Sequence, residues 1–274
     1  MSDKLYIDLL KMVLIDLHRV NQAEYKPIQN NNLSWKRKAL YSLNKFLAKR
    51  KFVICEVQEY NRELRVNGLD WPTYADSMIG LKRMNNIEFC FNQVIQDGVV
   101  GDFIETGVWR GGATIFMAAL LKENQISDRK VWVADSFEGL PKPNEEKYIY
   151  DKGDPHYLYK ELAISIDTVK DNFRKYDLLG DNIVFLKGWF KDTLPTAPID
   201  KLSIIRLDGD MYESTMDGLV NLYPKLSKGG YIIIDDWGAV KACQQAVIDY
   251  RNQNGISEEI NEIDGIGVYW QKNK

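Results

Sequence analysis

Short apolar runs alternate with amphipathic stretches over the larger part of the chain, from about residue 77 onward. Five of the runs have the length and composition of buried strands: Val100–Thr106, Lys130–Asp135, Asn182–Leu186, Leu202–Asp208 and Tyr231–Asp235. The stretches between them, near residues 112–124, 158–176, 214–227 and 239–253, carry apolar residues at helical spacing. Because continuous apolar strands that alternate with helices are typical of parallel sheets, the pattern predicts a Rossmann-like, open and mostly parallel α/β sheet with helices on both faces.

The two ends of the chain depart from this alternation. The segment Glu258–Ile263, the pair Asp264–Gly265 and the segment Ile266–Gln271 have the pattern of strand, tight turn and strand. They predict an antiparallel hairpin at the C-terminal edge of the sheet. Residues 1–70 have irregular helical spacing, and no linker rich in glycine or serine follows them. We expect a helical N-terminal cap over residues 1–70 that forms one structural unit with a Rossmann-like domain over residues 71–274.

A long polar and aromatic connection, residues 138–160, separates a predicted strand from the next predicted helix. Connections of this length inside a domain are lids, binding loops or disordered segments. Its tyrosines and prolines favour a lid. His156, one of two histidines in the chain, lies in this connection. A surface histidine is the simpler interpretation, and a catalytic role for it stays open.

Composition and charge exclude several classes of protein. The chain has 274 residues, a formal net charge of −3 and a pI of about 5.6, so general attraction to nucleic acid is not expected. Three scattered cysteines indicate neither a disulfide framework nor a zinc site, which suits a reducing cytoplasm. No stable membrane insertion is expected, because no apolar run approaches the length of a membrane span. Residues 34–51 hold seven Lys/Arg and no acid, which we interpret as a solvated helix face.

The first strand of the alternation leads through glycines into a helix, in the segment Glu105-Thr106-Gly107-Val108-Trp109-Arg110-Gly111-Gly112. Glycine permits a sharp turn and a close approach of backbone to ligand. In open α/β sheets a strand, glycine turn and helix of this kind hold nucleotide-like ligands. Glu105 precedes the first glycine and suits a cationic group better than a pyrophosphate. The segment therefore favours S-adenosylmethionine over a dinucleotide.

Two further segments complete a candidate site for such a ligand. Asp135 ends the second strand, where a carboxylate can bind both hydroxyls of a ribose. Gly188, Trp189 and Phe190 follow the third strand and offer an aromatic wall on which adenine can stack. Packing of the two aromatic rings in the core is the alternative interpretation.

Aspartates end the last two parallel strands: Asp208 after one, Asp235 and Asp236 after the other. Because the carboxyl ends of parallel strands meet at the same rim, we expect these carboxylates to lie close together and to repel one another. Mg²⁺, which prefers a few carboxylates plus water, would relieve the repulsion. We therefore predict a metal site of Asp208, Asp235 and Asp236, with Asp208 taking the proton from a hydroxyl bound to the metal. The alternative is that Asp235 and Asp236 cap a helix and face water.

The chain contains four motifs in this order: Glu105–Gly112, Asp135–Pro141, Arg206–Thr215 and Asp235-Asp236. In these motifs and their order it resembles the macrocin O-methyltransferase family, over about residues 70–270. The resemblance implies a methyltransferase that uses S-adenosylmethionine and Mg²⁺ to methylate a sugar hydroxyl of a natural product. It also implies a homo-oligomer, most simply a dimer. Carried onto this chain, Glu105, Gly107 and Asp135 fall in the donor site, and Asp208, Asp235 and Asp236 fall on the metal. Together with the residues around these motifs and the segment after the third strand, the candidate donor-binding residues are Glu105, Thr106, Gly107, Arg110, Gly111, Gly112, Asp135, Ser136, Phe137, Gly188, Trp189 and Phe190.

Three other readings of the same residues stay open at this point. Asp208-Gly209-Asp210 fits the nucleophile motif of a haloacid-dehalogenase-type phosphatase, although too few residues separate it from Asp235 for that family's remaining motifs. The glycines permit a nicotinamide-dependent oxidoreductase, but Glu105 and the acidic strand ends argue against it. A non-catalytic small-molecule-binding module of the same fold is the third. The sequence does not identify the acceptor.

Overall fold

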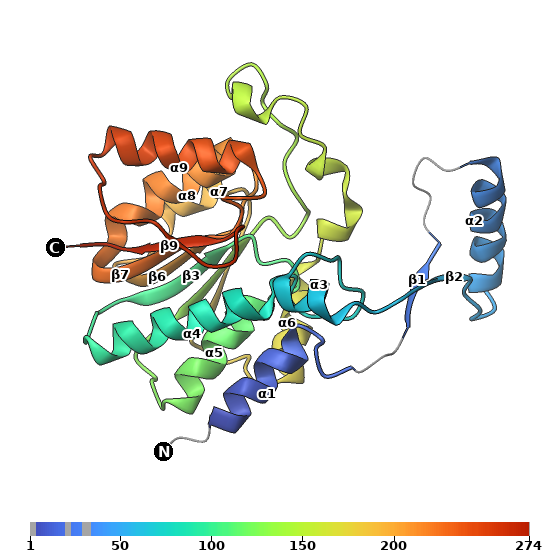
Figure 1. The fold of residues 1–274 in the computed structure, drawn as a ribbon, viewed down its shortest axis with the longest axis horizontal. Coiled ribbons are helices and arrows are strands. Elements are labelled where there is room, and N and C mark those ends of the chain that lie inside the picture. Colours follow the sequence, from blue (N-terminus) through green and yellow to red (C-terminus); the bar gives the residue numbers. More distant parts are fainter. Residues whose placement is uncertain (1–3, 20–22, 29–33, 274) are drawn as a thin grey trace.

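A seven-stranded sheet runs through the computed structural model, which describes residues 4–19, 23–28 and 34–273 (Figure 1). The strand order is β5-β4-β3-β6-β7-β9-β8. The parallel strands are β3 (Asp102–Thr106), β4 (Val131–Asp135), β5 (Ile183–Lys187), β6 (Leu202–Leu207) and β7 (Leu226–Ile234), and the antiparallel edge strands are β8 (Asn261–Glu262) and β9 (Val268–Gln271). The predicted fold class is therefore confirmed. The strand order reverses between β3 and β6, and a crevice at such a switch point is where open α/β sheets bind ligands.

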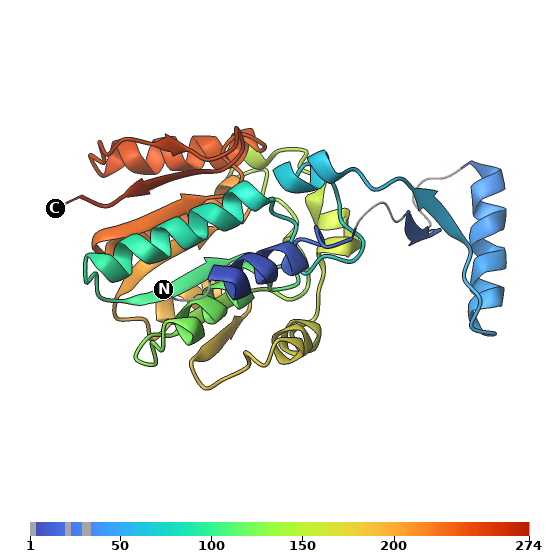
Figure 2. The same cartoon turned by 60° about the horizontal axis from the view of Figure 1, so that its bottom comes forward.

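Helices cover both faces of this sheet, as Figures 1 and 2 show. One face carries α1 (Lys4–Leu14), α4 (Leu81–Gln96), α5 (Gly112–Glu123) and α6 (Ile166–Lys175), and the other carries α7 (Phe190–Thr193), α8 (Tyr212–Leu222) and α9 (Lys241–Gln253). Successive strand residues alternate between two apolar cores: Phe103 belongs to the first and Ile104 to the second. This alternation follows from the pleat of a strand whose two faces are both buried.

The connection after β4 is longer than the sequence predicts. The predicted helix over residues 158–176 begins only at Ile166, where the Ser165 hydroxyl accepts a hydrogen bond from the Thr168 N–H and caps α6. Three single 3₁₀ turns precede it: η1 (Ile149–Asp151), η2 (His156–Leu158) and η3 (Lys160–Leu162). We call residues 138–165 the lid.

The N-terminal region is partly helical and partly extended. Helix α1 packs against the first core, and α3 (Arg62–Asn67) leads into α4. Between them, β1 (Glu24–Pro27) pairs antiparallel with β2 (Cys55–Gln58), and α2 (Trp35–Ala48) lies between the two strands in the chain. In both views β1, β2 and α2 form an arm that stands away from the sheet (Figures 1 and 2). The basic side chains of residues 34–51 are all exposed, as expected for a solvated face. In the described parts of the chain, no helix has the length and apolar character needed to cross a bilayer.

Candidate active site

A cavity opens at the carboxyl ends of β3, β4, β5 and β6. Six predicted donor-binding residues and the predicted catalytic residue line it: Gly107, Asp135, Ser136, Gly188, Trp189, Phe190 and Asp208. The lid contributes another part of the wall, with Gly139, Leu140, Pro141, Lys142, Asn144 and Leu162. The structure thus brings together strand ends that the sequence placed at one rim, and it covers them with the lid.

The glycine turn after β3 lies directly against the end of β6. Gly107 has a φ of +79°, and a Cβ atom there would lie 1.7 Å from the backbone oxygen of Asp208. The Asp208 N–H donates to the Thr106 oxygen at 2.9 Å. Only glycine fits at position 107, because it combines a left-handed conformation with a backbone contact that a side chain would block. This contact fixes the separation between the donor turn and Asp208.

Asp135 connects the end of β4 to the same turn. Its carboxylate accepts hydrogen bonds from the N–H groups of Val108 at 2.8 Å and Phe137 at 2.6 Å. Burial raises the pKa of Asp135, and these backbone bonds oppose the rise. A carboxylate can accept about four hydrogen bonds. The Ser136 hydroxyl donates a third, longer hydrogen bond at 3.4 Å, which leaves the carboxylate capacity for about one ribose hydroxyl on the side that lines the cavity.

Six of the predicted donor-binding residues do not line this cavity: Glu105, Thr106, Arg110, Gly111, Gly112 and Phe137. The guanidinium of Arg110 turns toward the other side and donates to the carbonyl groups of Thr73 and Ala75 at 3.1 and 2.7 Å. The Phe137 ring packs against Phe185. These residues belong to the glycine turn or its neighbours but have other partners than the cavity. A position close to the glycines in sequence was therefore not sufficient to predict a position in the cavity wall.

Glu105 is buried below the cavity, with 2% of its surface exposed, and forms an ion pair with Arg206. The same guanidinium binds Asp208 at 2.9 Å and forms a third ion pair with Asp235. Burial raises the pKa of Glu105 to about 7, and Arg206 opposes the rise. The cation that the sequence led us to expect beside Glu105 is thus a side chain of the protein. The sequence signal for this cation was Arg206 itself, an arginine within the buried strand β6.

Asp235 lies apart from the other strand-end acids. Its two carboxylate oxygens face Arg83, whose Nη1 is 2.6 Å away, and Arg206. Although burial acts in the opposite direction, these two arginines lower the pKa of Asp235. Asp235 and Asp236 lie in a bend directly after β7, and their carboxylates have different partners: Arg83 and Arg206 for Asp235, and the Asp210 N–H for Asp236. In this structure Asp235 belongs to a buried ion-pair network, whereas Asp208 and Asp236 lie together in a separate cluster. The metal site of Asp208, Asp235 and Asp236 stays a prediction.

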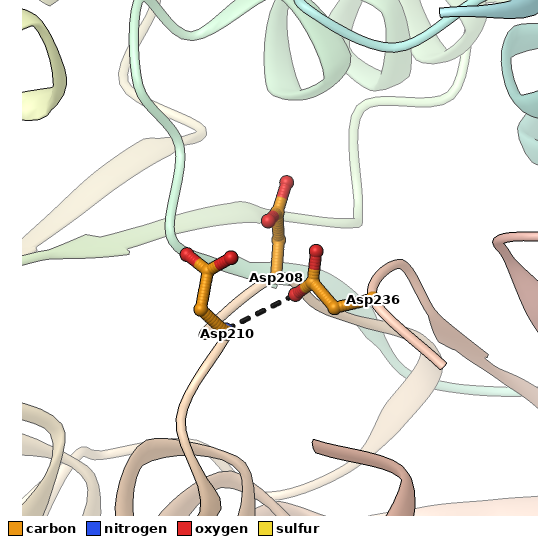
Figure 3. Close-up of side chains that lie close together, drawn as sticks. All are labelled: Asp208, Asp210 and Asp236. Atoms are coloured by element: carbon orange, nitrogen blue, oxygen red, sulfur yellow. Dashed lines mark hydrogen bonds between the residues drawn. The ribbon is translucent and has the colours of Figure 1, made fainter. Parts of the chain in front are cut away.

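Asp210 takes the third place in that cluster. Ligand oxygens of Asp208, Asp210 and Asp236 lie within 4.8 Å of one another, and Figure 3 shows the three carboxylates pointing to the same side. Asp236 accepts a hydrogen bond from the Asp210 N–H at 3.1 Å. Asp210 has a φ of +54°, a conformation uncommon outside glycine and one that marks functional loops. The cluster thus joins the loop after β6 to the loop after β7.

The three carboxylates of this acidic cluster disturb one another. Burial and the neighbouring acids raise the pKa of Asp208 and of Asp236 well above their ordinary value. Burial likewise raises the pKa of Asp210 to about 6. Several carboxylate oxygens at this spacing are the donors that Mg²⁺ and similar hard cations prefer. The residues present therefore fit a divalent cation, which would remove the repulsion.

Sequence reasoning missed several residues of the cavity: Trp109, Lys142, Asn144, Lys191, Glu213 and Asp217. The Trp109 indole donates to the Glu161 oxygen at 2.9 Å and so ties the glycine turn to the lid. Glu213 and Asp217 lie one turn apart on α8, which puts both on the same helix face. That spacing was visible in the sequence, but nothing showed which face would meet the cavity.

These strands and loops define a methyltransferase-type Rossmann fold, with a ligand cavity at the switch point and an acidic cluster beside the cavity. The chain belongs to the macrocin O-methyltransferase family, whose profile matches residues 3–272. It is therefore an O-methyltransferase. This membership removes the phosphatase, oxidoreductase and non-catalytic alternatives that the sequence had left open.

Individual relatives agree with the family. The chain is 52% identical over 216 residues to demethyldecarbamoylnovobiocin O-methyltransferase of Streptomyces niveus, which covers 78% of this chain and 82% of the relative. It is 51% identical over 213 residues to mycinamicin III 3''-O-methyltransferase of Micromonospora griseorubida, with 77% and 84% covered. Among solved structures, the O-methyltransferase NovP matches with a TM-score of 0.84 and 43% identity over 99% of both chains.

Proposed function

We propose that this enzyme transfers a methyl group from S-adenosylmethionine to a sugar hydroxyl of a natural product, with Mg²⁺ bound beside the donor. The observation that carries the proposal is that the acidic cluster adjoins the cavity, because Asp208 and Asp210 belong to both. The names of the relatives support the acceptor class: one acts on a novobiocin precursor, another on mycinamicin III and a third on a rhamnosyl-tetracenomycin.

The lining of the cavity supports the donor. Asp135 has unused acceptor capacity for ribose hydroxyls, and Trp189 and Phe190 offer rings for an adenine. The carboxylates of Asp135 and Asp208 give the cavity a negative character that suits a sulfonium and an ammonium group better than a phosphate. Glu105 contributes indirectly, because it helps Arg206 to hold Asp208.

The acidic cluster supports the metal. Asp208, Asp210 and Asp236 would hold the cation, with Asp210 in the place that the sequence gave to Asp235. A bound Mg²⁺ lowers the pKa of a hydroxyl that coordinates it and supplies a fixed positive charge. Asp208 orients the acceptor hydroxyl toward the donor cavity, and Arg206 keeps its carboxylate in one position. Such alignment can supply on the order of 7–11 kcal/mol of the barrier, more than proton removal alone.

Isotope transfer tests this function directly. The enzyme is incubated with S-adenosylmethionine that carries a deuterated methyl group and with a panel of acceptors: desmethyl glycosides of the novobiocin, mycinamicin and rhamnosyl-tetracenomycin types. We expect one acceptor to gain a single labelled methyl ether, and the gain to stop when the cation is chelated. Labelled product that forms equally fast in chelator would refute the role of the metal.

The homodimer and the cytoplasmic location expected from the sequence stay predictions.

The metal-free protein is expected to lose thermal stability as the pH rises from 5 to 8. The pKa of Asp210 is raised to about 6 and that of Glu105 to about 7, whereas both groups ionise near pH 4 in the unfolded chain. Because the unfolded chain gives up these protons first, stability present below pH 4 is lost as the pH rises through the folded values. Only ionised carboxylates bind the cation, so Mg²⁺ should raise the melting temperature by several degrees at pH 8 and by less at pH 5.

Differential scanning fluorimetry at both pH values, with Mg²⁺ and with chelator, measures this effect. The matched control is Asp171→Asn, which removes an exposed carboxylate of α6 and should leave the response to Mg²⁺ unchanged. An equal response to Mg²⁺ at pH 5 and pH 8 would contradict the assignment of the cluster.

A further inference from the structure

The arm formed by β1, β2 and α2 has almost no core of its own. Of the 14 residues of α2, all of which the structure describes, only Asn44 is buried. A two-stranded sheet and a single helix of this length are each marginally stable in water unless another surface covers them. In both views the arm stands away from the sheet, so the described body of the protein does not cover α2 (Figures 1 and 2). The arm is therefore suited to rest on a surface outside this chain.

Two contacts fix which face of α2 lies against the strands. The Asn44 side-chain oxygen accepts a hydrogen bond from the Ile54 N–H at 2.8 Å, and Arg37 forms an ion pair with Glu56 of β2. Positions 37 and 44 are seven residues apart, which puts both side chains on the same face of the helix. The opposite face of α2 therefore points away from β2.

That outer face carries an apolar stripe. Trp35, Leu43 and Phe46 lie on it at helical spacing, with 75%, 47% and 53% of their surface exposed. Single exposed apolar residues are normal on a protein, whereas a contiguous patch of large ones marks a site of interaction. The interpretation of residues 34–51 as a solvated helix face accounts for their cations but not for this stripe.

Cations border the stripe on both edges. By helical spacing Lys38, Lys45 and Lys49 follow one edge, and Lys36 lies at the other. Seven of the 36 Lys/Arg of the chain lie in residues 34–51, which hold no acid, and the remaining 29 stand against 39 Asp/Glu. Because the arm stands away from the sheet and salt screens charges over about 8 Å, the acidic remainder does not cancel the attraction of α2 for anions.

The cations lie directly beside the aromatic rings. The Lys36 ammonium is 5.9 Å from the centre of the Trp35 ring, and the Arg50 guanidinium is 4.4 Å from the centre of the Phe46 ring. A basic helix with Trp, Phe and Leu along one face is typical of helices that lie in the interface of an anionic bilayer. A second copy of the chain fits this face less well, because the cores of protein interfaces are depleted in lysine.

We propose that α2 is a peripheral membrane-binding helix. Its apolar stripe enters the headgroup region of a bilayer rich in anionic lipid, and its lysines bind the lipid phosphates. This association is reversible and needs no membrane-spanning segment. It goes beyond the proposed function, because it concerns where the enzyme works and holds for any acceptor.

Sedimentation of the full chain with vesicles tests the proposal. Vesicles of phosphatidylcholine alone are compared with vesicles that also contain phosphatidylglycerol, at low and at high salt. We expect the parent enzyme to bind the anionic vesicles at least about tenfold more tightly, and high salt to remove most of this difference. Phe46→Ser should weaken binding to the anionic vesicles by about fivefold or more. Its control, Val220→Ser, changes a residue of α8 that is also 53% exposed and should bind like the parent.

A second pair of variants tests the charge. Lys38→Gln combined with Lys45→Gln should weaken binding to the anionic vesicles by about tenfold or more. Lys228→Gln combined with Lys241→Gln removes the same charge at exposed positions outside the arm and should bind like the parent. All variants should keep the melting temperature of the parent, because none of these side chains belongs to either apolar core.

Three results would overturn the proposal: no binding to either kind of vesicle, equal binding to both, or equal losses in the α2 variants and their controls. A parent dimer that Phe46→Ser dissociates in analytical ultracentrifugation would also overturn it, since the stripe would then bind a second copy. Methyl transfer to an acceptor in solution should be the same in all these variants. Its absence from the parent would refute the proposed function, and the vesicle measurements would still decide the role of α2.

Discussion

Replacing Asp208 with Asn is expected to lower kcat/KM for methyl transfer by about 10³-fold or more. The side chain keeps its size, but the amide is neutral, is a weaker cation ligand and no longer balances Arg206. Loss of an interaction used mainly in the transition state lowers kcat and kcat/KM together. Affinity for S-adenosylhomocysteine should change by less than about threefold, because Gly107, Asp135 and Trp189, which also line the cavity, are unchanged. Steady-state kinetics and calorimetry on the same preparation measure both quantities.

Asp171→Asn is the control for this substitution, since it makes the same chemical change on an exposed position of α6. It should leave both quantities at the values of the parent. Equal losses of catalysis and donor affinity in Asp208→Asn would contradict the role given to Asp208, because they would place it in donor binding and not beside the acceptor.

The second large effect concerns stability. Arg206→Met is expected to lower the free energy of unfolding by about 3–5 kcal/mol, the usual cost of removing one partner from a buried ion pair. The substitution leaves Glu105 and one side of Asp235 without their cation inside the protein. For a chain of this size the loss corresponds to a fall in melting temperature of roughly 10 °C. Urea unfolding and calorimetry measure the two quantities.

Two further variants make this measurement specific. Arg174→Met removes an arginine whose side chain is 58% exposed and should change the unfolding free energy by less than about 0.5 kcal/mol. Adding Glu105→Leu to Arg206→Met removes one of the unpaired charges and should restore part of the loss. If Arg206→Met unfolds with the same free energy as Arg174→Met, the network does not stabilise the sheet as the structure suggests.

The sequence was sufficient for the fold because each parallel strand is a continuous apolar run. Residues 131–133 and 232–234 are buried on both faces, so nothing else in the local pattern competes with a strand. The sequence also predicted the antiparallel strands β8 and β9 at the C-terminal edge, from the pair Asp264-Gly265 between alternating residues. The connection is longer than the predicted two-residue turn and spans residues 263–267. The antiparallel pairing of β1 with β2 was not, because a helix separates the two strands and only their tertiary pairing defines them.

For the site, the sequence predicted that the acidic residues lie at the carboxyl ends of the parallel strands, but it did not predict where each side chain points. The sequence placed Asp208 and Asp236 at one rim because both follow parallel strands, and their carboxylates lie close together. It also placed Asp235 there, because adjacent residues look equivalent in sequence, whereas in the structure Asp235 faces Arg83. It assigned Asp210 only to the alternative phosphatase function. Which of these carboxylates bind a metal stays a prediction.

Diffraction from a crystal soaked in Mn²⁺ with S-adenosylhomocysteine would show directly whether a cation binds beside the donor, because anomalous scattering locates the cation and the same map shows the donor product. We expect one strong anomalous peak among Asp208, Asp210 and Asp236, next to a ligand that lies against Gly107, Asp135 and Trp189. An occupied donor cavity with no anomalous peak among these carboxylates, or with a peak held by Asp235 in place of Asp210, would contradict this expectation.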